Sequence, residues 1–542
     1  MRKNEIYSGL EMKKKLLAGI MKVSDAVSST LGARGRTVMI EQEFGVPHIT
    51  KDGVTVAKSI HLKEPIENVG AKLIRQASEM TNREAGDGTT TSTLLASEMI
   101  KEGMKFVASG VDPNAIRRGI EKVTVNIIED IKAESREIKD SDEIMNVALI
   151  SSNGDQVISR VVTEALDKVG KDGIIMVENS SDDRTYFETH EGYNFDKGFF
   201  SPFFSTDMTK YECVMEGANV LLINGEISEV QTLAPLLSEC AQKGKKLIIF
   251  TDNVGNETLQ IFVQNKMRGV NSCCLVKNDG YGQSRLDFLE DMSAVTGARV
   301  FSKDMGDDFS KIQMKDLGFV KKIIVDRDKT TILRHESVDD SKVRPRIEAL
   351  KNKLTTTESA FEKKKIEERI AKLQGGIGVI YVGAVTEAEL KERKDRLDDA
   401  INATRSAVQE GIVCGGGAFL LKLSELMNEY NKDENIEGDE IYGFKILKKV
   451  LQAPLKKIVE NSGRSGDVIA SKIIDSDFTL KYDARNDVMV AYDDPKIVDP
   501  TKVVRLALTH ASSTACLILT SDYCVVFEEE FPDMMERSGG GL

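Results

Sequence analysis

Apolar residues recur at helical spacing through much of the chain. Leu16, Ile20, Val23 and Val27 repeat at intervals of four, three and four residues, which predicts an amphipathic helix near the start. Helical patterns continue to about residue 132. Two charged amphipathic helices are predicted later, on the apolar positions Ile347, Leu350, Leu354, Ile366, Ile370 and Leu373.

The middle of the chain has a different pattern, in which short apolar runs alternate with helical ones. Residues 220–223, 246–250 and 273–276 are candidates for buried strands, and helices are predicted at about 230–243 and 256–269. This alternation is typical of an α/β domain with a largely parallel sheet. Mostly helical parts are therefore expected together with an α/β part.

A charged hairpin is predicted early in the chain. Residues 37–40 and 47–50 have the composition of short strands, and Lys51-Asp52-Gly53 has that of a turn before a further strand at 54–56. This arrangement would place Lys51 and Asp52 at the hairpin tip. A charged tip is usually only solvated, so the hairpin alone does not predict a site.

The stretch Gly86-Asp87-Gly88-Thr89-Thr90-Thr91 suggests phosphate chemistry. Asp is a favoured N-cap, and the small residues beside it leave the N–H groups of a helix start open to an anion. A carboxylate would repel a bare phosphate unless a hard cation lay between them, and Mg²⁺ accepts such oxygen ligands. The stretch is interpreted as a metal–nucleotide site. The alternative is an ordinary Asp-capped helix, which three consecutive threonines disfavour.

Two later segments add to this interpretation. A helix is predicted to begin at Asp398-Asp399 and to reach Gly411, and Gly415-Gly416-Gly417 follows it. Consecutive glycines permit a close backbone approach, which suits a phosphate or a tight helix junction.

Phenylalanines are concentrated between residues 195 and 204, where the loop-forming Pro202 also lies. Such density more often marks a core than a site. Aromatic residues in a loop are nevertheless typical of a binding surface, so both interpretations stay open.

Composition narrows the function classes. At 542 residues roughly three domains are expected, and the net charge of −13 disfavours nucleic acid as a main partner. No run of about 18 apolar residues and no cleavable targeting segment is evident, so a cytoplasmic protein without a membrane span is expected. The seven cysteines predict reduced thiols, and Cys273-Cys274 lacks the spacing of a zinc site.

Several motifs together resemble one family, the group I chaperonins, which are the sixty-kilodalton GroEL-type folding machines. The resemblance covers essentially the whole chain in order. It rests on Thr30-Leu31-Gly32, Phe44-Gly45, residues 50–58, Gly86 through Thr91, Ala403-Thr404-Arg405, Gly415-Gly416-Gly417 and Asp499-Pro500-Thr501-Lys502-Val503.

The resemblance implies a multidomain α+β and α/β fold with three domains, two of which are split. A mostly helical equatorial ATPase domain would comprise residues 1–135 and 411–542, and a small intermediate domain residues 136–190 and 377–410. An α/β apical, client-binding domain would be inserted at 191–376, with hinges near Gly192 and Gly375.

The resemblance also implies roles for individual residues. Asp87 would hold Mg²⁺, and Asp399 would orient the attacking water with Asp52 opposite it. Oxygens of Thr30, Lys51 and Thr90 would hold K⁺. The nucleotide would contact Thr30, Leu31, Gly32, Ala33, Lys51, Asp87, Gly88, Thr89, Thr90, Thr91, Gly416, Asp483, Ala484 and Asp499.

Client binding and assembly are implied in the same way. Phe199, Phe203, Phe204, Leu237, Leu259 and Val263 match client-binding positions, whereas Lys197, Glu387, Lys105, Lys456 and Ser465 match subunit contacts. Departures from the family include Ala33 and Asp483 near the nucleotide, and Ala234 and Gln264 in the client groove, which would make that groove less apolar. Ser465 offers no carboxylate to Lys456, so a weak contact between two rings is expected.

The function implied is an ATPase chaperonin that captures non-native proteins and promotes their folding in a closed chamber. ATP, Mg²⁺ and K⁺ would be its cofactors. Seven-membered rings, single or double, and a ten-kilodalton co-chaperonin lid would be its assembly partners. The alternatives are a holdase or scaffold that binds ATP without turnover, and a phosphotransferase, for which no Gly-x-x-x-x-Gly-Lys loop or kinase catalytic loop is found.

Overall fold

The computed structural model describes residues 4–42, 47–170, 173, 175–208, 210–335, 340–357, 359–374, 376–433 and 438–527. The chain forms two compact units. Unit 1 contains Met1–Asp167, Val177–Tyr186 and Ile380–Leu542, and unit 2 contains Lys168–Met176 and Phe187–Val379. Both ends of the chain therefore build unit 1. The division into three domains, with the boundaries expected above, stays a prediction.

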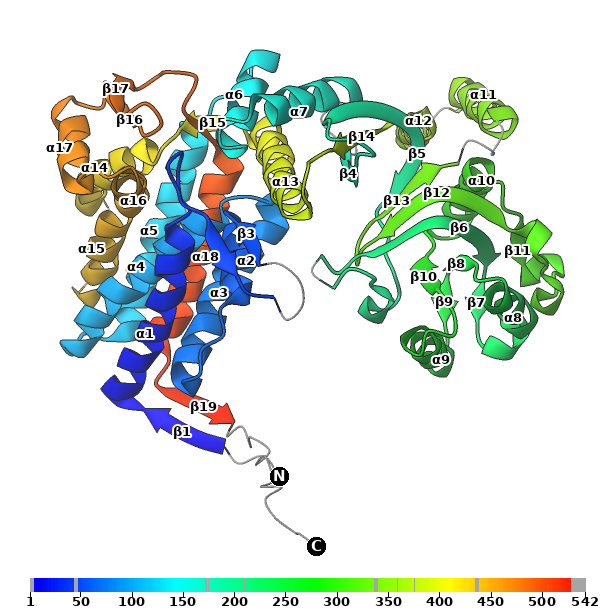
Figure 1. Ribbon diagram of the computed structural model, residues 1–542, viewed down its shortest axis with the longest axis horizontal. Coiled ribbons are helices and arrows are strands. Elements are labelled where there is room, and N and C mark those ends of the chain that lie inside the picture. The colour runs from blue at the N-terminus through cyan, green and yellow to red at the C-terminus, as the bar shows by residue number, and fades with distance from the viewer. Residues whose placement is uncertain are drawn as a thin grey trace, which may run out of the picture. The chain divides into compact units, whose positions relative to one another are not determined.

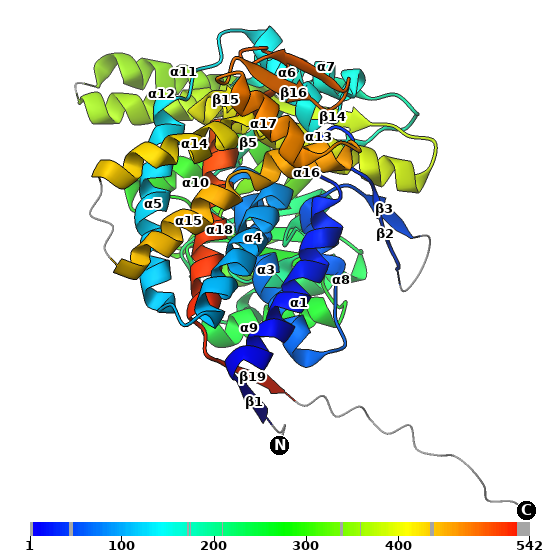
Figure 2. The same ribbon diagram turned by 90° about the vertical axis from the view of Figure 1, so that its left-hand side faces the viewer.

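Unit 1 is a helical bundle around α18 (Thr501–Thr520), which packs against α3 (Pro65–Ala85), α4 (Thr89–Ala108) and α5 (Pro113–Ala133). The first predicted helix is confirmed as α1 (Gly9–Ser28), whose four apolar positions are buried against this bundle. In Figures 1 and 2 segments from both ends of the chain lie side by side here. The other helices of this unit are α2 (Gly53–Ser59), α6 (Ser141–Ser151), α13 (Glu387–Glu410), α14 (Ala418–Asp433), α15 (Ile441–Val450), α16 (Ala453–Asn461) and α17 (Gly466–Asp475), and α7 (Gln156–Val169) begins in it.

Four antiparallel strand pairs complete unit 1. They are β1 (Asn4–Ser8) with β19 (Tyr523–Phe527), β2 (Val38–Ile40) with β3 (His48–Thr50), β15 (Ile412–Cys414) with β18 (Val498–Pro500), and β16 (Leu480–Asp483) with β17 (Val488–Ala491).

Helix α18 is long and apolar enough to cross a membrane by length and composition alone. Within its most apolar window 72% of the residues are buried inside the structure. The burial identifies α18 as the core helix of the bundle.

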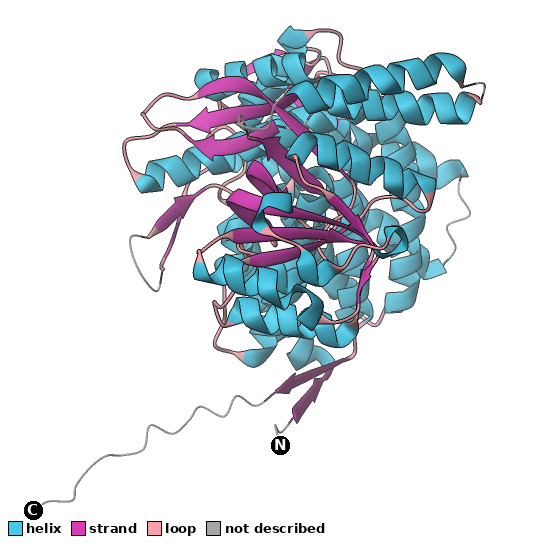
Figure 3. Ribbon diagram, turned by 90° about the vertical axis from the view of Figure 1, so that its right-hand side faces the viewer, coloured by secondary structure: helices cyan, strands magenta, loops and turns pink. Residues whose placement is uncertain are grey.

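Unit 2 is built on a mixed sheet (Figure 3). The strand order is β10 (Cys273–Lys277), β8 (Lys246–Thr251), β6 (Cys213–Asn224), β12 (Gly318–Val325), β13 (Thr330–Arg334) and β5 (Tyr186–Phe195), and β11 (Val300–Ser302) also pairs with β6. The order continues to β14 (Gly376–Val382) and β4 (Ile175–Asn179), in which the chain passes between the units.

The three predicted buried strands are confirmed as β6, β8 and β10, and they run parallel. Strand β12 is antiparallel to β6 and β13, and β13 is antiparallel to β5, so the sheet is less parallel than expected. Helices α8 (Ala234–Gln242), α9 (Asn256–Met267), α10 (Gln283–Thr296), α11 (Asp340–Thr356) and α12 (Ala360–Gln374) complete unit 2, and short 3-10 turns include η1 (Pro202–Phe204).

Two local predictions were wrong. Residues 54–56 are not a strand: they lie in α2, because the Asp52 carboxylate accepts the N–H groups of Val54 and Thr55 and so starts a helix. The helix carrying Asp399 begins eleven residues earlier than expected (398 − 387), at Glu387, where Thr386 is its N-cap. The predicted motif Phe44-Gly45 lies outside the described residues, as does the hinge expected near Gly375.

Candidate nucleotide site

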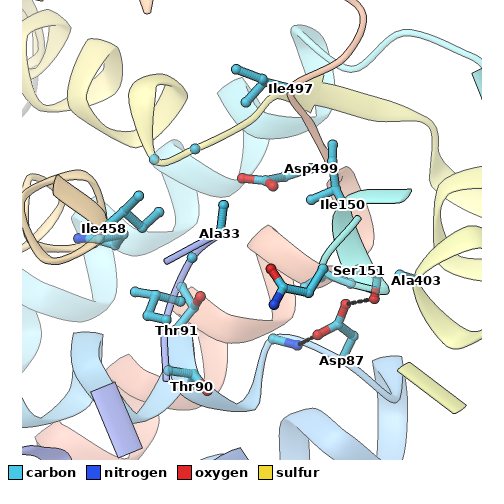
Figure 4. A pocket seen from close by; sticks show the side chains of 18 of the residues that line it. Ala33, Asp87, Thr90, Thr91, Ile150, Ser151, Ala403, Ile458, Ile497 and Asp499 are labelled. Carbon is cyan, nitrogen blue, oxygen red and sulfur yellow. Dashed lines mark hydrogen bonds between the residues drawn. The ribbon is translucent and has the colours of Figure 1, made fainter. Parts of the chain in front are cut away.

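A cavity of about 510 Å³ opens in unit 1 among segments from both ends of the chain (Figure 4). Every residue expected at the nucleotide and every expected catalytic residue lines it. Those residues are Thr30, Leu31, Gly32, Ala33, Lys51, Asp52, Asp87, Gly88, Thr89, Thr90, Thr91, Asp399, Gly416, Asp483, Ala484 and Asp499. The roles of the individual residues stay predictions.

The start of α4 forms one wall of the cavity. The N-cap is Gly88, with φ of +79°, and no side chain caps the helix, so the expected Asp cap is corrected by one residue. Asp87 instead accepts the Gly88 N–H at 2.6 Å through Oδ1 and the Ser151 hydroxyl at 3.2 Å through Oδ2 (Figure 4). The uncapped N–H groups of α4 face a carboxylate at the cavity wall, as a phosphate–cation site requires.

The start of α2 lies against the start of α4. A Cβ atom on Gly53 would come within 2.4 Å of the Thr90 hydroxyl, so only glycine permits this approach. The hydroxyls of Thr30 and Thr90 are 3.4 Å apart. Two helix starts and two hydroxyls therefore converge on one end of the cavity.

Burial and neighbouring carboxylates raise the pKa values of Asp87 and Asp399 at this end of the cavity. Burial, together with the charge of Asp52, raises the pKa of Asp87 to about 6. Burial raises the pKa of Asp399 well above its usual range, and the charges of Asp87 and Asp52 act in the same direction. A bound cation would favour the ionised form of these buried carboxylates.

The glycine run forms the opposite wall. Gly416 and Gly417 have φ of +69° and +76°, and a Cβ atom on Gly417 would lie 2.5 Å from the Leu455 nitrogen. The N–H groups of these two glycines bond the Asp499 carboxylate, while burial and Asp87 raise its pKa to about 6. The run thus serves a tight junction that also orients Asp499 at the cavity.

The Asp483 carboxylate forms hydrogen bonds within its own turn. Its Oδ1 accepts the N–H groups of Arg485 at 2.8 Å and Asn486 at 3.1 Å. Ala484, the next residue, is buried. The carboxylate here fixes the β16–β17 turn beside the cavity.

Sequence reasoning missed several residues of the site, chiefly in the segment after α6. Asn153 has φ of +56°, and in the amide orientation that satisfies its hydrogen bonds it accepts from Lys51 Nζ at 2.7 Å and donates to the Ala33 carbonyl at 3.1 Å. Ser151 holds Asp87, and Arg396 also lines the cavity. The polar run Ser151-Ser152-Asn153-Gly154-Asp155, directly after a helix, was the available signal.

The residues expected to bind clients differ in how exposed they are. Phe199, Phe204 and Leu237 are buried in the core of unit 2, so the expectation that they line an exposed surface is corrected. Phe203 is 60% exposed, while Leu259 and Val263 are partly buried against the same core. Fewer of the expected client-binding residues are therefore exposed than the resemblance implies.

Most of the residues expected at subunit contacts are exposed on the surface of their own unit. Lys105 forms an ion pair with Glu102 at 2.7 Å, and Lys456 forms one with Asp467 at 2.7 Å. Ser465 and Glu387 are exposed, and Lys197 is half-buried. Lys456 therefore has a carboxylate partner within its own chain.

Binding of Mg²⁺-nucleotide should weaken below pH 6. Asp87, the expected Mg²⁺ ligand, has a pKa of about 6, as does Asp499, and a cation at Asp87 would have to displace its proton, so affinity should fall roughly tenfold per pH unit below pH 6. The raised pKa values also mean that the folded protein binds extra protons between pH 3.8 and about 6, so its stability without ligand should fall as the pH rises through that window. Titration calorimetry with Mg²⁺-ADP at pH 5 to 8 would measure the affinity, with EDTA as the control. A pH-independent affinity would contradict this prediction.

Comparisons with known proteins were made for the whole chain. The model of the TCP-1/cpn60 chaperonin family matches residues 23–529. Among solved structures, the chain is similar to the chaperonin gp146 from the bacteriophage EL 2 (Pseudomonas aeruginosa), solved in the presence of ATP-BeFx. The match has a TM-score of 0.64 and 20% identity and covers 97% of this chain and 99% of that one, which shows a shared fold.

Proposed function

The chain belongs to the TCP-1/cpn60 chaperonin family, and from that premise we propose that it is an ATP-hydrolysing chaperonin of the group I type. The observation that carries the proposal is the convergence of Asp52, Asp87 and Asp399 on two helix starts within one cavity. Phosphoryl transfer needs positioning and charge neutralisation, and this arrangement offers both. The solved neighbour gp146 was crystallised with ATP-BeFx, which supports a nucleotide in the corresponding cavity.

The donor set suits hard cations. Within the described residues no group of three or more His, Cys, Asp or Glu side chains could hold a metal ion alone, so a cation here would need phosphate oxygens as well. Asp87 would hold Mg²⁺, and the oxygens of Thr30, Lys51 and Thr90 would hold K⁺. When bound, these cations would neutralise phosphate charge. The chain itself would bind phosphate with the N–H groups at the start of α4.

Asp399 would orient the attacking water and accept its proton. Its raised pKa favours proton uptake, and its helix α13 brings it to the same cavity as Asp52 and Asp87. A holdase that binds ATP without turnover would keep the cavity but not the hydrolysis. A steady-state ATPase assay on the purified protein tests the proposal, because absence of turnover would leave only the holdase.

Clients would be captured by the exposed apolar surface of unit 2. Phe203 lies in η1, which contacts α9, and α9 exposes Ile261 and Met267. Such apolar surface binds unfolded segments without reading their sequence. Phe199, Phe204 and Leu237 would support this surface from within the core.

Phe203→Glu should abolish capture of a denatured client and leave the fold and ATPase intact, because Phe203 is exposed and a charge there meets only the client. Phe204→Glu, the matched change one residue on, should unfold unit 2, since Phe204 is fully buried and its backbone carbonyl accepts from Lys266. Aggregation of a chemically denatured client reports capture, and limited proteolysis reports folding. Normal capture by the Phe203 variant would remove Phe203 from the client surface.

Assembly would follow the family. We infer homo-oligomeric rings, with seven members as in group I, and a chamber that a small co-chaperonin could close. The pairing of Lys456 with Asp467 within the chain agrees with a weak contact between rings. Native mass spectrometry would give the number of subunits directly.

A further inference from the structure

A contact outside the nucleotide cavity joins the strand before Asp52 to the helix that carries Asp399. His48, at the start of β3, is 7% exposed, and its Nε2 lies 3.5 Å from Oδ2 of Asp395 on α13. The Thr50 hydroxyl donates to the same oxygen at 3.3 Å. His48, Thr50 and Asp395 do not line the cavity, so the proposed hydrolysis does not use them directly.

Each side of this contact leads to a carboxylate of the site. On β3, Thr50 accepts the N–H of Asp52 at 3.0 Å, and Asp52 then starts α2. On α13, Asp395 and Asp399 are four residues apart and therefore lie on one face of the helix. The contact thus joins α13, one helical turn before Asp399, to Thr50, whose hydroxyl accepts the backbone N–H of Asp52.

The charges around the contact favour its persistence at neutral pH. Burial, with the charges of Asp52 and Asp398, raises the pKa of Asp395 to about 6, so the carboxylate is ionised at pH 7 and can accept from Thr50. Burial and Lys391 lower the pKa of His48, which leaves its imidazole neutral. Within the described residues His48 Nε2 makes no hydrogen bond, so the hydrogen bond of this contact is the one from Thr50, and His48 packs 3.5 Å from the same carboxylate oxygen.

The geometry points to His48 and Asp395 as positioning residues for Asp399. By fixing α13 against β3, they set the rotation of the helix and hence the place of the Asp399 carboxylate relative to Asp52 and the phosphate end of the cavity. This inference rests on the proposed ATPase function. The simpler alternative is that the contact only stabilises the β2–β3 hairpin.

A kinetic separation distinguishes the two roles. In the full-length assembled protein, Asp395→Ala should lower kcat for ATP about 10- to 100-fold, the scale of a misplaced catalytic group, while KM changes less than about threefold. Asp395→Asn keeps an oxygen that can accept from Thr50 and should recover kcat to within about threefold of the wild type. Glu389→Gln, also on α13 but bonded to Val385 and Arg393, is the matched control and should leave kcat unchanged.

A double-mutant cycle tests the contact itself. His48→Ala should lower kcat as Asp395→Ala does, and the double variant should be no slower than the slower single variant. Light scattering of each variant verifies assembly, and the His48 variants decide the matter if Asp395→Ala does not assemble. A pH profile would not separate the groups, because Asp87 and Asp499 also have pKa values of about 6.

The outcomes separate this inference from the function on which it rests. Wild-type protein without ATP turnover would overturn the proposed function and this inference together. Wild-type turnover with a normal kcat in Asp395→Ala, or additive effects in the cycle, would overturn the inference alone. Loss of kcat that asparagine does not recover would assign the contact a purely structural role and would also overturn it.

Discussion

Asp399→Ala should still bind ATP but lose nearly all hydrolysis, with kcat lower by ~10²-fold or more, the scale of removing a positioned base. Asp399 lines the cavity, and its raised pKa comes from burial and from Asp87 and Asp52. Removing it takes a carboxyl from that cluster and adds no charge that would repel a phosphate, so nucleotide affinity should hold or rise. Single-turnover kinetics with labelled ATP measures the chemical step, and calorimetry measures binding.

The neighbouring carboxylate provides the control for Asp399. Asp398 is on the same helix turn but does not line the cavity, so Asp398→Asn should retain turnover within a few-fold. Asp399→Asn, which keeps the size of the side chain but not its basicity, should be as slow as the alanine variant. Turnover near the wild-type level in either Asp399 variant would remove this residue from the mechanism.

Asp291→Ala should destabilise unit 2 by about 3 kcal/mol or more, the usual effect of breaking a buried ion pair from one side. Asp291, on α10, is fully buried and accepts from Arg346 Nε at 2.8 Å and from Arg369 Nε at 2.7 Å. These arginines come from α11 and α12, so the carboxylate holds the helix pair on the domain. Its loss removes the buried carboxylate that these two guanidinium groups share.

Each arginine has a further carboxylate partner, which limits the loss of stability, and one of these partners supplies the control variant. Arg346 also pairs with Glu290, which is exposed, so Glu290→Ala should cost no more than ~1 kcal/mol. Hydrogen exchange of α11 and α12 in increasing urea measures the stability of unit 2. Nucleotide binding, which is proposed for unit 1, should be unchanged in both variants. If Asp291→Ala exchanged like the wild type, the ion network would carry little of the stability.

Local pattern was enough to predict much of the fold. The spacing of Leu16, Ile20, Val23 and Val27 predicted α1, and three apolar runs predicted β6, β8 and β10, because a helix or strand must bury one face or both. Small residues and a carboxylate at 86–91 predicted a nucleotide site, and the structure places residues 87–91 in the wall of a cavity; the role of that cavity stays a prediction. Resemblance to a family then added residues from distant parts of the chain.

Tertiary structure decided what the pattern could not. Periodicity does not show which face of a Phe-rich loop meets the core, and packing buried Phe204 while leaving Phe203 exposed. The side chain of Asp52 caps a helix that composition alone assigned to a strand, because a cap depends on where the backbone turns. The contact of His48 with Asp395 joins residues 347 positions apart along the chain (395 − 48). Sequence determined the local elements and the chemical groups that they carry. Long-range packing decided which of these groups lie close together, because a side chain becomes buried and interacts with another charge only when distant segments are brought together.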